Sequence, residues 1–140
     1  MGRWNPWHTV GREYPHIVVS TEHQLPDGVV GLWEGRIIWL CKTLSQAERR
    51  SVLTHELMHV GRGLVPLRYR AREELVVDKL AARRLIELPE LIDALRETND
   101  VHQLAERLWT DVHTVKVRLD DLDPIEVAEV EHALEDLWIP

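Results

Sequence analysis

A chain of 140 residues can build one hydrophobic core but not two independent ones, so we expect a single domain over residues 1–140. Its composition, 44% hydrophobic and 29% charged, is typical of a soluble globular protein. The net charge of −7 argues against broad binding to a phosphate backbone, which needs clustered Lys and Arg. The single cysteine, Cys41, excludes an internal disulfide and is expected to be buried at the end of a strand. The sequence shows neither a secretory signal pattern nor an apolar run near the ~20 residues of a spanning helix, so we expect a cytoplasmic protein without a membrane partner.

The first part of the chain predicts an irregular arm followed by strands over residues 16–41. Residues 1–15 contain two tryptophans without a clear period, which indicates an arm that packs on its own core or on a partner. A short strand is expected at residues 16–20. Residues 29–33 and 36–40 form a hairpin pattern, in which the intervening glycine can adopt a positive φ.

A helix is expected from about Gln46 to Val60, because Ser45 and Glu48 form a capping-box pattern and two glycines follow the helix. It carries the sequence His-Glu-Leu-Met-His over residues 55–59. Apolar residues recur on one face, away from the histidines, so the helix has a core face and a separate ligand face. The core face consists of Leu53, Leu57 and Val60.

The His-Glu-x-x-His pattern predicts a metal site. His55 and His59 lie one helical turn apart, so both imidazoles can reach one ion. Zn²⁺ binds imidazole nitrogen and keeps a position for water when the protein supplies three ligands. Glu56, next to these ligands, is then placed to take a proton from that water.

A third ligand is expected from a second helix over residues 73–86, which contains no Gly or Pro. Glu74 and Asp78 share one face of it, and that face continues into apolar residues. The pattern favours Glu74 as the third ligand and Asp78 as an acceptor for the free N–H of a ligand histidine. Glu73 remains an alternative ligand, and a solvated acidic first turn remains an alternative explanation. The other histidines are expected at the surface: His8, His16, His23, His102 and His113.

Two segments beside this motif are candidates to contact a substrate. The hairpin over residues 29–40 can hold an extended peptide by strand addition, although a purely structural hairpin explains the pattern equally well. The arginine-rich connection over residues 64–72 offers donors for an oxyanion, although a solvated basic loop is the simpler interpretation. The candidate donors are Arg62, Arg68, Tyr69 and Arg70.

The chain beyond residue 88 is expected to be helical. Residues 90–97 predict a short helix, and residues 101–108 and 112–119 predict a pair spaced like a helix-turn-helix. The second helix of that pair offers only Lys116 and Arg118 before an acidic run, so DNA binding is not expected. A last helix is predicted from about Pro124 to Trp138.

The motif in its context resembles a known family. The run TLSQAERRSVLTHELMHVGRG over residues 43–63, followed by Glu74-x-x-x-Asp78-x-x-Ala81-Ala82, is similar to the ImmA/IrrE family of small zinc metallopeptidases. The likeness covers about residues 28–122 and is closest to short members carried by phages and mobile elements of actinobacteria. Family members often have an aromatic residue where this chain has Leu80.

This resemblance implies His55, His59 and Glu74 as Zn²⁺ ligands and Glu56 as the general base. Mn²⁺ is the alternative ion that the sequence leaves open. It also implies a protein substrate, a helix-turn-helix repressor of a phage or mobile element, cut in the host cytoplasm. The predicted fold is an α+β, zincin-like domain with a short sheet, two zinc-site helices over residues 45–88 and a helical part over residues 89–140. The alternative function is a regulator with a structural zinc site that binds protein or DNA through its C-terminal helices.

Overall fold

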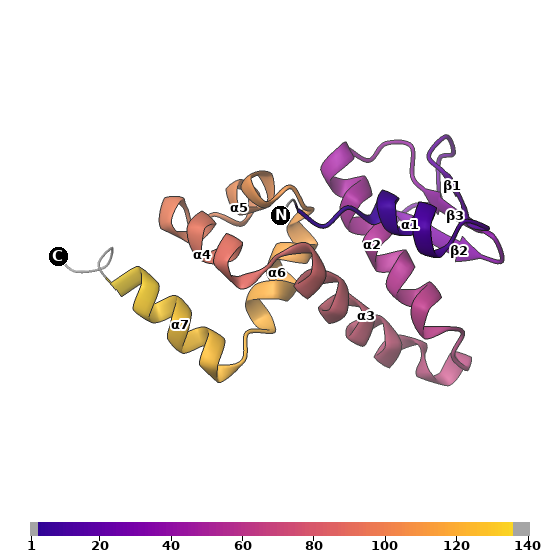
Figure 1. The fold of residues 1–140 in the computed structure, drawn as a ribbon. Coiled ribbons are helices and arrows are strands. Elements are labelled where there is room, and N and C mark those ends of the chain that lie inside the picture. The colour runs from indigo at the N-terminus through magenta and orange to yellow at the C-terminus, as the bar shows by residue number, and fades with distance from the viewer. Residues whose placement is uncertain (1–2, 136–140) are drawn as a thin grey trace.

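The structure is a computed structural model and describes residues 3–135. Within that range the chain forms seven α-helices, one 3-10 turn and three strands, which confirms the α+β class. The sheet lies at one end of an elongated molecule and α7 at the other (Figure 1). The elements are α1 (Pro6–Glu13), β1 (Val18–Ser20), β2 (Gly31–Glu34), β3 (Ile37–Leu40), α2 (Gln46–Arg62), η1 (Leu67–Tyr69), α3 (Arg70–Leu85), α4 (Leu88–Glu97), α5 (Val101–Leu108), α6 (Val112–Asp120) and α7 (Pro124–Leu134).

The sheet has the strand order β1-β3-β2, with β1 parallel and β2 antiparallel to the central strand β3. The hairpin between β2 and β3 turns at Gly35, whose φ of 58° is costly for residues with a side chain. Ile38 and Leu40 on β3 are fully buried, and Cys41 is buried directly after them, as predicted. Because β2 is outermost in this order, one of its edges has no strand partner within the sheet.

Helix α2 packs on this sheet through the core face that the sequence predicted. Its N-terminus has the full capping box, since the Ser45 hydroxyl accepts from the Glu48 N–H and the Glu48 carboxylate accepts from the Ser45 N–H. Leu53 and Leu57 are buried against Ile38, and Val60 packs on the same cluster. The opposite side of the helix therefore remains for the histidines.

The expectation of an irregular arm over residues 1–15 is wrong, because residues 6–13 form helix α1. Its start has a clear local cause: the Asn5 side chain accepts from the Trp7 N–H, and Pro6 at the first helical position needs no donor partner. The arm is tied to α2 by the Trp4 indole N–H, which donates to the Thr54 hydroxyl at 2.9 Å.

The helices beyond α2 form a second core. Its buried residues come from α3, α4, α5 and α6 and the links between them: Ala81, Leu85, Ile86, Leu91, Ala94, Leu104, Ala105, Leu108 and Val115. Helix α3 begins at Arg70, three residues before the predicted start, and the last four helices confirm the predicted helical part. The predicted end of the last helix falls on residues 136–140, outside the described residues. None of the described helices combines the length and the apolar character needed to cross a membrane.

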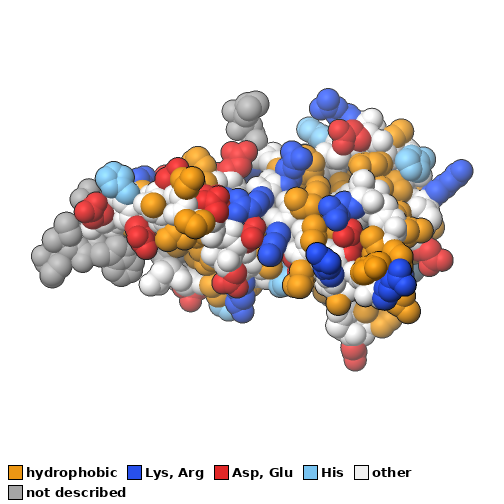
Figure 2. All heavy atoms as spheres, turned by 90° about the horizontal axis from the view of Figure 1, so that it is seen from below, with side chains coloured by type: hydrophobic (Ala, Val, Ile, Leu, Met, Phe, Trp, Pro, Cys, Tyr) orange, Lys and Arg blue, Asp and Glu red, His pale blue; other side chains and the backbone are white. Residues whose placement is uncertain are grey.

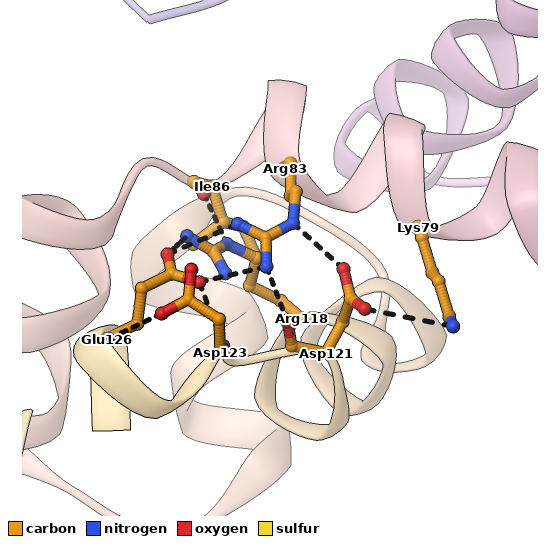
Figure 3. A network of polar contacts seen from close by, with 7 residues as sticks. All are labelled: Lys79, Arg83, Ile86, Arg118, Asp121, Asp123 and Glu126. Atoms are coloured by element: carbon orange, nitrogen blue, oxygen red, sulfur yellow. Dashed lines mark hydrogen bonds and ion pairs between the residues drawn. The ribbon is translucent and has the colours of Figure 1, made fainter. Parts of the chain in front are cut away.

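A network of charged groups anchors α7 and the end of α6 to α3 (Figure 3). The Arg83 guanidinium donates to the carboxylates of Asp121 and Glu126. The buried Arg118 guanidinium donates to the Glu126 carboxylate and to the Ile86 carbonyl oxygen. Glu126 also completes the capping box of α7 with Asp123, so one carboxylate joins three helices.

This network makes the stability of the fold sensitive to acid. The hydrogen bond from Arg83, supported by Arg118, lowers the pKa of Glu126 from 4.5 to about 2. Because the folded-state pKa is below that of the unfolded chain, the carboxylate contributes fully above pH 4.5 and loses its contribution as the pH falls toward 2.

We therefore expect Glu126→Gln to lower the free energy of unfolding at pH 7 by about 2 kcal/mol, and by less at pH 3. Denaturant titrations at both pH values measure this difference. Glu129→Gln, on an exposed position of the same helix, is the control and should change little. An equal loss for Glu126→Gln at the two pH values would contradict the assigned role of its charge.

Candidate metal centre

Two histidines of α2 meet on the side of the helix that faces away from the sheet. Their rings lie 4.8 Å apart between centroids, and the two Nε2 atoms are 3.2 Å apart. Ligands at ~2.0–2.1 Å from a tetrahedral ion are separated by about 3.3 Å, so this spacing suits a shared ion. Both side chains, His55 and His59, are about one fifth exposed, which leaves them accessible yet held by the protein.

Glu74 of α3 completes a group of three donors. Its carboxylate oxygens lie 2.9 Å from His55 Nε2 and 2.6 Å from His59 Nε2. One donor atom from each of the three residues lies within 4.8 Å of the others, and the group is a possible metal site. Two imidazoles and one carboxylate are a donor set that Zn²⁺ accepts in sites that retain an open position. The side chain of Glu74 is 54% exposed, so the site opens toward solvent.

Glu73, the alternative ligand, lies elsewhere. Its carboxylate receives two hydrogen bonds from the Arg62 guanidinium, at 2.7 and 2.9 Å, and the residue is buried. Arg62 holds the pKa of the Glu73 carboxyl below its ordinary value. This pair joins the end of α2 to the start of α3, which gives Glu73 a structural place and leaves the position beside the histidines to Glu74.

Asp78 lies one turn further along α3 and connects the centre to α6. Its carboxylate lies 3.0 Å from His55 Nδ1, the nitrogen that does not face His59. This is the contact expected of a group that orients a metal ligand. The other oxygen of Asp78 lies 3.1 Å from Nε2 of His113, a residue that the sequence placed at the surface. His113 is exposed, but it is bound to the site through this carboxylate.

Glu56 is buried between the metal centre and strand β2. Burial raises the pKa of its carboxyl from 4.5 to about 7, with His59 opposing and Glu74 adding to the shift. A carboxyl with a pKa near neutrality suits proton transfer at neutral pH. The strand approaches it closely only because residue 31 is glycine: a Cβ there would lie 2.5 Å from Val52 Cγ1 and 3.2 Å from Glu56 Oε1.

Two hollows open on either side of Glu56. The larger, about 350 Å³, lies between β2, α2, α3 and α6, and the smaller, about 240 Å³, lies between β2 and the turn that joins α2 to α3. Glu56, Glu74 and Gly31 line both of them. The metal centre therefore lies in the wall of a depression that follows strand β2, and His113 lines its larger part.

Comparisons with protein-family models, with curated proteins and with solved structures find no match to this chain.

The motif predicts His55, Glu56 and His59, and the helix over residues 73–86 predicts Glu74, whereas the sequence does not indicate that His113 and Gly31 reach the site. His113 follows Asp78 by 35 residues and lies in a helix pair that suggested a different use. No local pattern marks either residue. Only the packing of α6 on α3, and of β2 on α2, brings them to the site.

The adjacent pair Glu73 and Glu74 provides a matched test of the ligand set. We expect Glu74→Gln to weaken Zn²⁺ binding by more than the ~10–100-fold typical of a change outside the ligands, because a charged donor is lost. Glu73→Gln should retain Zn²⁺ affinity and lower stability, because Arg62 loses its partner. Isothermal titration with Zn²⁺ and thermal unfolding separate the two effects. The reverse pattern would make Glu73 the ligand.

Asp78 can be tested without touching a ligand. Asp78→Asn removes the charge that faces His55 Nδ1 and should lower Zn²⁺ affinity by about 10–100-fold. His113→Gln, which changes the other partner of the same carboxylate, is the control and should affect Zn²⁺ binding less. Equal affinities of the wild type and Asp78→Asn would show that Asp78 does not support the centre.

Proposed function

We propose that this protein is a zinc-dependent metallopeptidase. The observation that carries the proposal is the convergence of His55, His59 and Glu74 next to a buried carboxyl, that of Glu56, in an open depression. Catalytic zinc sites keep one position for water or substrate, whereas structural sites are closed by four protein ligands. In residues 3–135 this group has three protein donors. A zincin-like fold is part of the same proposal.

Bound Zn²⁺ would lower the pKa of a water molecule and polarise the carbonyl of the scissile peptide bond. The protein supplies the proton transfers. The Glu56 carboxylate accepts a proton from the water while the water oxygen attacks the carbonyl carbon. The same carboxyl then donates that proton to the amide nitrogen as the C–N bond breaks. Asp78, through its contact with Nδ1, keeps His55 in a fixed orientation.

Strand β2 is the candidate surface for holding the peptide. It is the outer strand next to the centre; its first residue, Gly31, lines both hollows, and Leu32 and Trp33 line the smaller one. An extended peptide added to this edge would pass from one hollow to the other across Glu56. Main-chain hydrogen bonds would position it, and the two hollows would take side chains on either side of the scissile bond.

The family resemblance supports a narrower form of the proposal. It implies a single protein substrate, a helix-turn-helix repressor of a phage or mobile element, cut in the host cytoplasm to relieve repression. Within this proposal the physiological ion is Zn²⁺, with Mn²⁺ as the other candidate.

The structure offers less support for the alternative, a regulator that binds DNA through α5 and α6. Arg118, one of the two basic residues expected on the second helix, is buried and donates to Glu126 and to a backbone carbonyl. Lys116 is therefore the one exposed Lys or Arg on that helix, and it lies next to an acidic run. A purely structural zinc site also has no use for a buried carboxyl beside its ligands.

Replacement of the proposed base tests this function. We expect Glu56→Gln to keep Zn²⁺ bound and to lower the rate of peptide cleavage by about 10²–10⁴-fold, because proton transfer to a positioned base is lost. Zinc content by elemental analysis and cleavage by mass spectrometry measure both properties. Glu97→Gln, at an exposed position on α4, is the control. Turnover of Glu56→Gln at the wild-type rate would exclude Glu56 as the base.

A further inference from the structure

The turn between α2 and α3 differs in charge from the rest of the chain. Residues 62–72, which span the last residue of α2, the turn itself and the first residues of α3, contain four arginines and no acidic residue, whereas the whole protein has a net charge of −7. Arg62 is neutralised by Glu73. In the part of the chain that the structure describes, no ion pair involves the other three, Arg68, Arg70 and Arg72, and all three are exposed. This turn therefore presents unpaired positive charge on an otherwise acidic protein.

The same turn also exposes apolar side chains. Leu64 is 87% exposed and Leu67 is 79% exposed, and Tyr69, with Arg68 stacked over its ring, is also exposed. Figure 2 views the molecule from the side on which this turn projects and shows Lys and Arg interspersed with hydrophobic side chains. Scattered exposed leucines are ordinary, but several in one short turn form a surface that fits a partner with apolar and acidic groups.

The turn borders the candidate metal centre. Arg70 and Leu64 line the smaller hollow together with His59, Glu74 and residues of β2. A peptide held along β2 would therefore meet the Arg70 guanidinium a short way from Glu56. Arginine binds a carboxylate through two parallel hydrogen bonds, which gives direction as well as affinity.

Resting on the function proposed above, we propose that the α2–α3 turn is the subsite that selects the substrate. It takes an acidic side chain close to the scissile bond, through Arg70, with a bulky apolar side chain beside it, against Leu64 and Leu67. Repulsion by the acidic remainder of the protein disfavours other placements of an acidic peptide, so the charge of the turn also sets the direction of the chain in the depression. Nucleic acid fits less well, because three exposed arginines give few phosphate contacts.

Synthetic decapeptide mixtures that carry Glu, Gln or Lys at one fixed position test the proposal on the zinc-loaded protein. At one position on one side of the scissile bond, we expect kcat/KM to be at least about 10-fold higher for peptides with Glu than for peptides with Gln. A hydrogen-bonded charged pair typically contributes a difference of this size. Arg70→Gln should bring the ratio of kcat/KM for Glu peptides to kcat/KM for Gln peptides to about 1, with the zinc content of the wild type. Arg70→Glu should transfer the preference to Lys. Arg12→Glu changes the net charge equally at an exposed position on α1 and should keep the Glu preference.

To separate this inference from the proposed function, binding of the same peptides to the zinc-loaded Glu56→Gln variant is measured by isothermal titration calorimetry. Preferred binding of Glu peptides that depends on Arg70, without cleavage by the wild type, would leave the subsite standing and overturn the peptidase. Cleavage or binding that is indifferent to Glu, or a complete lack of peptide binding, would overturn the subsite. Duplex DNA that binds the wild type but not Arg70→Glu, in place of peptide, would overturn it as well.

Discussion

The buried guanidinium of Arg50 joins α2, which packs on the sheet, to the helices that form the second core. It donates to the carbonyl oxygens of Trp4, Leu85, Leu108 and Trp109, at 3.0, 3.4, 3.3 and 2.8 Å. A buried charge is costly unless its donors are satisfied, and here the acceptors are the chain before α1, the end of α3 and the link between α5 and α6. Because Arg50 is on the same helix as His55 and His59, its bond to the Leu85 carbonyl holds the C-terminal end of α3 against the helix that carries them.

Those parts of the site that belong to one helix could be predicted from the sequence, because helical geometry alone relates them. The capping box defines where α2 begins, the period of Leu53 and Leu57 defines its core face, and the remaining face places His55, Glu56 and His59. The choice of Glu74 over Glu73 depends in addition on how α3 is rotated about its axis relative to α2. The sequence does not determine which of these two adjacent residues faces the histidines. In the structure Glu73 pairs with Arg62, and Glu74 faces the histidines.

The parts that could not be predicted arise from contacts between distant segments. His113 reaches Asp78 only because α6 packs on α3. Gly31 matters only because β2 lies so close to Val52 and Glu56 of α2 that a Cβ at this position would clash. Helix α1 is a different case, since its start is marked by the local signals of Asn5 and Pro6. Trp4, just before the helix, donates to Thr54 of α2, and Val10 within the helix packs on the core beneath α2.

The C-terminal helices explain why a helix-turn-helix spacing need not indicate DNA binding. A recognition helix must present basic side chains to the DNA groove. On α6, however, Arg118 points into the protein and donates to the Ile86 carbonyl oxygen and to the Glu126 carboxylate, which helps to hold α7. The face of α6 near its start supplies His113 to Asp78 and Thr114 to the larger hollow. Both ends of α6 are thus committed to α3, one at the candidate centre and one at the charged network, so the helix supports the wall of the depression in which Glu74 lies.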